Sequence, residues 1–293
     1  MLRKLLKYDI KSIWRVWWIM AIVVVAAEIL GAFCVRGYTG MIMLNESALS
    51  NTEELMVTIT GIISMVGLML CFFVIFASFV VTEILVFIRY YKNFFSDEGY
   101  LTFTLPVNRR THLLSKTINA MIWAAAEIGL MILGVFIFLL LAPTPEKGFI
   151  TLNGYIGFGY VMGELWNIIG GWLIAYILGF IFAMLCTAFF QITLVFLCIT
   201  VGSVIARRRK VLAEIGLYLG SNSLITSAAE LLFLFNMSFI SIGLSRLLTG
   251  ATLGEGCAVF FLIMLIVCAV ILTVALTFWS ITMNCIRRRL NLA

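Results

Sequence analysis

The chain has 293 residues, of which 63% are hydrophobic and only 12% are charged. Soluble globular proteins carry about 25% charged residues, so this composition excludes an ordinary soluble domain. Several apolar runs are longer than the roughly 18 residues at which a segment is read as membrane-spanning. The formal net charge of +6 comes from basic residues that flank these runs, which indicates membrane topology and no nucleic-acid partner. We therefore expect an all-α integral membrane protein.

The first 15 residues predict an amphipathic helix. Its apolar residues recur at three- and four-residue steps, and its cations follow the same rhythm on another face: Leu2, Leu5, Leu6, Ile10 and Ile13 against Arg3, Lys4, Lys7, Lys11 and Arg15. Such a helix lies in the membrane interface with its cations toward anionic headgroups. The alternative is a basic flank that only fixes the topology.

The apolar runs and the breaks between them predict six membrane-spanning helices. These are Trp17–Val35, Val57–Ile88, Thr117–Ala142, Gly171–Ala206, Val211–Phe235 and Cys257–Asn284. The second and fourth exceed the roughly 20 residues that a span needs, so we expect them to tilt or to project beyond the bilayer. Residues 143–170 and 236–256 are expected to form outer-face loops or short helices. The whole chain, 1–293, then makes one transmembrane domain.

The distribution of Lys and Arg predicts the orientation. Seventeen of the 20 basic residues lie in four segments, 3–15, 89–116, 207–210 and 287–289. Because basic residues accumulate in cytoplasmic segments, we expect these four segments and both termini on the cytoplasmic side.

Polar residues inside the spans are candidates for a pathway. Glu127 lies eleven residues after Lys116, or about 16 Å along a helix, which places it near the bilayer midplane. A charge there costs about 3 kcal/mol, so Glu127 is either a polar contact in a translocation path or a member of a buried interhelical hydrogen bond. Glu28 falls in the outer half of its span, where we expect it to reach water more easily.

The fifth span holds a second polar group. Gly216 and Gly220 form a G-x-x-x-G step, and Asn222, Ser223 and Thr226 follow it. Small residues let helices approach closely, and hydroxyl groups can bond across the contact. The pattern fits a wall of the pathway, a subunit interface or ordinary packing within the chain.

Other motifs argue against an enzyme on this chain. The seven cysteines lie mostly inside spans and are expected to pack as small apolar residues, although Cys34 and Cys257 are one candidate pair for a bridge. His112 is the sole histidine and has no clustered ligands, so no metal site is expected. No G-x-x-x-x-G-K-[ST] string occurs, so ATP is not expected to bind here as it does to a P-loop protein.

The connection between the second and third spans mixes charges with aromatic residues. We expect the second span to continue as a helix through Arg89–Phe95. Ser96 can then cap a short helix whose first turn carries Asp97 and Glu98, where carboxylates favour the helix dipole. The next helix is expected to start at Pro106. The result is a cytoplasmic elbow whose exposed apolar side chains suit lipid or a protein partner.

The stretch "DEGYLTFTLPVNRRTHLLSK", 97–116, resembles the intracellular element of type-2 ABC exporter permeases, most closely those of Gram-positive bacteria. The matching residues are Glu98, Gly99, Leu101, Leu105, Pro106, Val107, Arg109 and Lys116. Tyr100 stands where that pattern usually has Thr, and Asn108 where it usually has Ser. Some of these permeases are linked to export of, or resistance to, antimicrobial peptides.

The resemblance implies a mechanism. Two such subunits, identical or different, would pair in the cell membrane above two separate ATPase subunits, which hold ATP and Mg. Closure of the ATPases would push the elbow, and the residues expected at that contact are Asp97, Glu98, Gly99, Tyr100, Leu101 and Phe103, supported by Arg109 and Arg110. The alternatives are a secondary carrier or channel that needs no ATPase, and a membrane scaffold or sensor.

Overall fold

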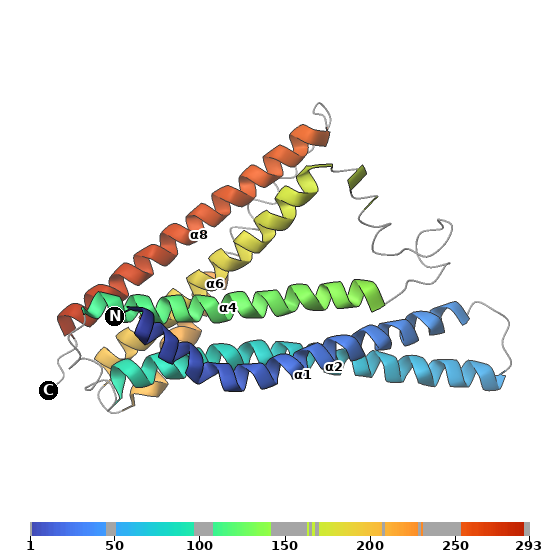
Figure 1. Ribbon diagram of the computed structural model, residues 1–293, viewed down its shortest axis with the longest axis horizontal. Helices are drawn as coiled ribbons and strands as arrows, with labels where there is room; N and C mark the ends of the chain where they lie inside the picture. Colours follow the sequence, from blue (N-terminus) through green and yellow to red (C-terminus); the bar gives the residue numbers. More distant parts are fainter. Residues whose placement is uncertain are drawn as a thin grey trace. The chain divides into compact units, whose positions relative to one another are not determined.

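The computed structural model describes residues 2–44, 51–96, 108–141, 163, 166–167, 170–206, 209–227, 230 and 253–289. This part of the chain contains helices and no strands. The labelled helices are α1 (Leu2–Leu44), α2 (Asn51–Phe95), α4 (Arg109–Leu141), α6 (Trp172–Ile205) and α8 (Leu253–Arg289) (Figure 1). A further helix covers residues 210–227. The all-α prediction is confirmed for the described residues.

Five of these helices are long and apolar enough to cross a membrane. The candidate spans are Arg3–Val35, Thr58–Phe95, Arg109–Ile137, Trp172–Ile205 and Cys257–Arg287. They correspond to the first, second, third, fourth and sixth predicted spans. The predicted fifth span, Val211–Phe235, is helical over 210–227 but is not among the five, so the count of six stays a prediction.

Exposed apolar side chains support the membrane assignment. Phe72, Phe73 and Phe76 of α2 are each 65–69% exposed. A patch of this kind is rare on soluble monomers, because apolar surface in water is costly. In a bilayer the same side chains meet lipid tails.

The chain divides into two compact units. Unit 1 contains residues 1–10, 85–124 and 169–293, and unit 2 contains residues 11–84 and 125–168. The helices α1, α2 and α4 therefore each contribute one end to unit 1 and the remainder to unit 2. The described parts of α6, of the helix at 210–227 and of α8 belong to unit 1 alone.

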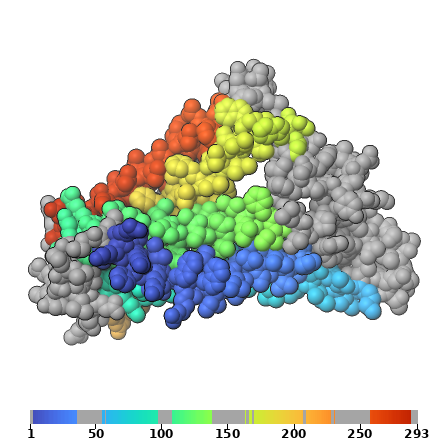
Figure 2. Space-filling view, viewed as in Figure 1, coloured from blue at the N-terminus to red at the C-terminus, as the bar shows by residue number. Residues whose placement is uncertain are grey.

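In unit 1, α6 and α8 pack side by side, as the yellow and red helices of Figure 2 show. Gly179 permits the close approach, because a Cβ atom there would overlap the methyl group of Met264 and lie 3.0 Å from the ring of Phe261. The hydroxyl of Tyr176 donates a hydrogen bond of 2.8 Å to the carbonyl of Cys257. A small residue and a polar bond thus fix this pair where their side chains are mostly apolar.

The end of α6 folds back tightly onto the following helix. A Cβ on Gly202 would lie 2.9 Å from the Cα of Glu214 and 3.0 Å from its nitrogen. Because those neighbours are backbone atoms, they cannot move aside as a flexible side chain can. The close approach of α6 to the helix at 210–227 therefore depends on a glycine at position 202.

In unit 2, cysteines serve as packing residues, as predicted. A Cβ on Gly67 of α2 would lie 2.8 Å from the sulfur of Cys34 on α1. All seven cysteines are free. The candidate bridge between Cys34 and Cys257 is therefore not formed.

The amino-terminal residues are helical, but the predicted interfacial helix stays a prediction. Residues 2–15 are helical, and the five cations of the basic face are all exposed. They do not form a separate element, because α1 continues from Leu2 to Leu44 without a break. Placement of this segment in the membrane interface stays a prediction. Of the predicted outer-face segments, 143–170 lies outside the described residues apart from 163, 166, 167 and 170, and 236–256 does so until α8 begins at Leu253.

Candidate functional site

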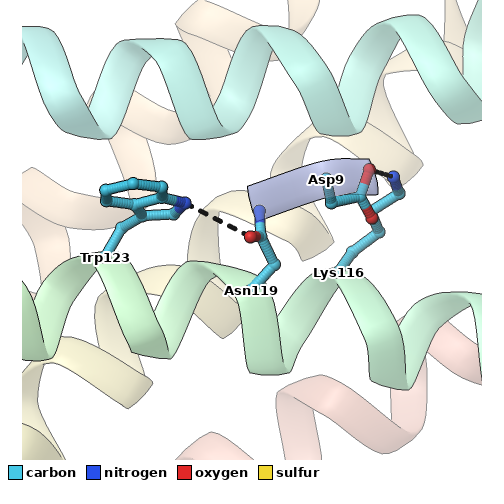
Figure 3. Close-up of polar contacts among 4 residues, drawn as sticks. All are labelled: Asp9, Lys116, Asn119 and Trp123. Carbon is cyan, nitrogen blue, oxygen red and sulfur yellow. Dashed lines mark hydrogen bonds and ion pairs between the residues drawn. The ribbon is translucent and has the colours of Figure 1, made fainter. Parts of the chain in front are cut away.

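A buried ion pair joins α1 to α4 in unit 1. The ammonium nitrogen of Lys116 lies 2.6 Å from Oδ1 of Asp9, and each side chain is only 10% exposed. Figure 3 shows the Lys116 side chain reaching from α4 to the Asp9 carboxylate on α1. Removing one partner of a buried pair leaves an uncompensated charge, so each residue constrains the other. The sequence places Lys116 in the basic segment 89–116 without a partner; the structure pairs it with Asp9.

The first turns of α4 present a polar face to the interior of unit 1. The indole of Trp123 donates to Oδ1 of Asn119 at 3.2 Å within the same helix (Figure 3). From α8, the indole of Trp279 donates to the hydroxyl of Thr117 at 3.3 Å. His112, at 2% exposure, is also buried on this helix. The bond from Trp279 requires one rotation of α4 about its axis, because Thr117 must face α8. This polar face therefore helps to fix the orientation of α4 within unit 1.

Arg109 ties the first residue of α4 to the end of α8. Its guanidinium donates to the carbonyl of Ile286 at 3.0 Å and to that of Arg287 at 3.4 Å. The last carbonyls of a helix lack partners within the helix, and a cation also suits the negative end of the helix dipole. Arg109 thus has a structural role, whereas Arg110 is exposed and available to a partner.

The start of α4 differs from the prediction. Asn108 is not helical, and α4 begins at Arg109, so the predicted start at Pro106 is wrong by three residues. The side chain of Asn108 accepts a hydrogen bond from the backbone N–H of Arg110 at 3.2 Å. Its carbonyl accepts from the N–H of Thr111. Asparagine is favoured at this capping position because it satisfies N–H groups that the helix leaves free.

The other side of the elbow is the end of α2. The helix continues to Phe95, as predicted for 89–95, and the hydroxyl of Ser96 donates to the carbonyl of Lys92 at 2.5 Å. The predicted short helix that Ser96 would cap lies outside the described residues. So do the predicted contacts Asp97, Glu98, Gly99, Tyr100, Leu101 and Phe103.

The end of α2 is anchored to α6. Tyr90 stacks on Phe196 with ring centroids 3.9 Å apart and planes 10° apart. The hydroxyl of Tyr90 lies 2.9 Å from that of Thr200, where either can donate. Tyr90, Phe94 and Phe196 are among the most buried side chains of the described chain. Aromatic pairs with a satisfied hydroxyl make strong anchors, so the last turns of α2 are held firmly in unit 1.

In unit 2, Glu127 of α4 binds two other helices. Its Oε1 accepts from the indole of Trp17 on α1 at 2.9 Å and from the hydroxyl of Thr82 on α2 at 2.7 Å. Glu127 is 4% exposed. The partner that the sequence requires for this residue is therefore a pair of hydrogen-bond donors. Of the two alternatives for Glu127, a contact in a translocation path and a buried interhelical hydrogen bond, this geometry matches the second.

Substitutions of Glu127 should separate packing from transport. Glu127→Leu removes the acceptor of two buried donors, and each such loss costs about 1–3 kcal/mol, so we expect a clearly lowered unfolding temperature in detergent. Glu127→Gln keeps a carbonyl oxygen and should fold with near-wild-type stability while altering transport. Wild-type transport by Glu127→Gln would assign the residue to packing alone.

The polar group of the predicted fifth span is only partly engaged. Thr226 is exposed, and its hydroxyl donates to the carbonyls of Asn222 and Ser223 in its own helix. A Cβ added to Gly216 or Gly220 would meet no atom within 4 Å. Within the described residues, therefore, the G-x-x-x-G step is not used for packing inside the chain. This group belongs to unit 1, whereas Glu127 belongs to unit 2.

Asp9 is the site residue that the sequence reading missed. A signal for it exists: Asp9 follows Leu5 by four residues and precedes Ile13 by four, so it interrupts the apolar face of the amino-terminal helix. A carboxylate on such a face needs a buried cation. Which cation it meets depends on tertiary packing, which spacing within one helix does not reveal.

Comparison with models of known protein families, with curated proteins and with solved structures found no match. Among the described residues, no group of three or more His, Cys, Asp or Glu side chains is placed to hold a metal ion.

Proposed function

We propose that this chain is the membrane-spanning subunit of an ATP-driven exporter of the type-2 ABC class. In this proposal residues 89–116 form the coupling element, and separate ATPase subunits with bound ATP and Mg drive it from the cytoplasm. A second permease subunit, identical or different, completes the pathway in the cell membrane. The chain itself hydrolyses nothing.

The observation that supports the proposal most strongly is the anchoring of both ends of the elbow within unit 1. On the α2 side, Tyr90 is locked against Phe196 and Thr200 of α6. On the α4 side, Arg109 holds the end of α8 and Lys116 holds Asp9 of α1. A coupling element needs such rigid attachments, because a force on a loose loop would be lost in the loop itself. A push on 97–107 would reach five helices: α2 and α4 directly, and α6, α8 and α1 through these contacts.

The same contacts support the proposed orientation. They join the start of α1, the end of α2, the start of α4 and the end of α8 within one unit. The close contact between Gly202 and Glu214 adds the end of α6 and the start of the helix at 210–227. These are the helix ends that carry the four basic segments. Basic segments gathered at one end are what the positive-inside rule requires of a cytoplasmic face with both termini on it.

The pathway is the less constrained part of the proposal. Glu127 is its best candidate because it is a carboxylate deep in a span, and Asn222, Ser223 and Thr226 are secondary candidates on the helix at 210–227. A face with Gly216 and Gly220 open suits close approach by another helix, which a second subunit would supply.

The main rival is a secondary carrier or channel, and a scaffold or sensor is a third reading. Carriers often show inverted repeats and helices broken at the midplane. No repeat is visible in the sequence, and α1, α2, α4, α6 and α8 are continuous helices in the described part of the chain. Both observations favour the exporter.

The test is purification of the tagged chain from its native membrane, followed by reconstitution into liposomes. We expect an ABC ATPase to co-purify in a fixed ratio and to hydrolyse ATP with Mg, with stimulation by cargo such as peptide antibiotics. Transport by the purified chain alone, without nucleotide, would establish the carrier instead.

A further inference from the structure

Glu28 is a buried carboxyl group that the proposed function does not use. It lies on α1 inside the candidate span Arg3–Val35 and is only 7% exposed. Its Oε2 is buried and has no hydrogen-bond partner in the described structure. The expectation that this residue reaches water easily is therefore wrong for the arrangement seen here. Its difference from Glu127, which accepts two hydrogen bonds, calls for a physical account.

The carboxyl group of Glu28 sits in a space that α4 leaves open. A Cβ atom on Gly134 would overlap the Oε1 and Cδ atoms of Glu28. The absence of a side chain at Gly134 is thus what admits the carboxyl group between the two helices, which run side by side in unit 2 (blue and green in Figure 2).

No described charged group faces this carboxyl group. On α1, Glu28 lies eleven residues, or about 16 Å, beyond Trp17, the level at which Glu127 of α4 meets α1. Glu83 of α2 follows Thr82, which bonds Glu127 at that same level. The cations of α1 on either side of Glu28 are Arg15, thirteen residues or about 20 Å before it, and Arg36, eight residues or about 12 Å after it along the helix.

On the other helix that packs here, the titratable group nearest in level is a thiol. The Cβ of Cys71 on α2 would lie 3.5 Å from a Cβ on Gly31, about one turn beyond Glu28. A thiol is neutral in apolar surroundings and supplies no compensating charge. Among the described side chains, therefore, neither a cation nor a hydrogen-bond donor is paired with the buried Oε2 of Glu28 to stabilise a negative charge.

An ionised, unpaired carboxylate in an apolar interior is far more costly than a protonated one. We propose that Glu28 is a proton-binding site of the membrane domain, an uncharged acid while it rests against Gly134. When the contact between α1 and α4 opens and water enters, the carboxyl O–H bond breaks, the proton passes to water and a carboxylate remains. Closing the contact reverses the step, so the helix pair takes up and releases one proton as it moves.

The test uses dicyclohexylcarbodiimide, an apolar reagent that adds to protonated carboxyl groups and leaves a stable N-acylurea. The full chain in lipid nanodiscs is treated near neutral pH, and the adducts are located by mass spectrometry. We expect at least tenfold more adduct at Glu28 than at Glu127, whose acceptor oxygen is already engaged, and a decline in labelling as the pH is raised. Equal labelling of the two residues, or labelling of Glu127 alone, would overturn the proposal.

A second readout needs no chemical modification. The infrared difference spectrum between the wild type and Glu28→Gln should show loss of the carbonyl stretch of a protonated acid. Glutamine resembles the neutral acid in shape and charge, so this variant should fold with unchanged stability. Loss of a carboxylate band instead would show that Glu28 is ionised. Neither readout depends on an ATPase, so failure here is distinct from failure of the exporter proposal.

Discussion

Replacing Lys116 with methionine is expected to destabilise the protein by about 3–5 kcal/mol, the usual cost of removing one partner of a buried ion pair. Methionine fills much of the volume of the lysine stem but leaves the buried charge of Asp9 without the ammonium 2.6 Å away. The loss is measured as the shift in the denaturant or thermal midpoint of the purified protein in detergent. It should also loosen the attachment of the amino-terminal residues to α4.

Two controls isolate the ion pair from the loss of a lysine in general. Lys7→Met removes an exposed cation from the same amino-terminal segment and should change stability by less than about 0.5 kcal/mol. The double variant Asp9→Asn with Lys116→Met removes both charges and should recover a large part of the loss, because no buried charge is then left uncompensated. Equal effects of Lys116→Met and Lys7→Met would mean that the pair contributes nothing.

Reversing the charge of Glu98, or deleting Gly99–Phe103, is expected to abolish stable association with the ATPase while the chain remains in the membrane. Glu98→Arg places a cation where the proposed contact has a carboxylate, and a like-charge or desolvated mismatch at an interface costs several kcal/mol. Since the anchors of the elbow at Tyr90, Arg109 and Lys116 are untouched, the fold should survive. The measurement is the amount of ATPase that co-purifies with the tagged chain.

Glu46→Arg is the matched control for this experiment. It makes the same change of charge in the connection between α1 and α2, which the positive-inside pattern assigns to the other side of the membrane. It should leave co-purification of the ATPase unchanged. Wild-type recovery of the ATPase by Glu98→Arg and by the deletion variant would refute the assignment of the elbow as the coupling contact.

The helices were predictable because hydrophobic length dominates membrane insertion. Of the six spans predicted from apolar runs, five coincide with helices long and apolar enough to cross a membrane. The extension of α2 to Phe95 was predicted from the aromatic and basic residues at 89–95. Boundaries set by a single side chain were harder. The helix α4 begins at Arg109 and not at Pro106, and the amide oxygen of Asn108 accepts a hydrogen bond from the N–H of Arg110. Apolar periodicity does not predict such a cap.

For the polar contact of Glu127, the sequence indicated that residue but not its partners. The sequence indicates that Glu127 needs a partner, but Trp17 and Thr82 are 110 and 45 residues away from it. The same limit applies to Lys116 and Asp9, which lie 107 residues apart. A polar or charged side chain buried in a membrane span needs a hydrogen-bond donor or a counter-ion. Packing between helices that are distant in sequence decides which residue supplies it.

The central claim is that the elbow between α2 and α4 faces the cytosol and is bound by an ATPase. A membrane-impermeant maleimide applied to intact cells and to inside-out vesicles of the Glu98→Cys variant tests it most directly, with the modified cysteine located by mass spectrometry. The account predicts labelling of position 98 only in inside-out vesicles, and protection of that position when the ATPase is bound. Labelling of position 98 on intact cells would contradict it.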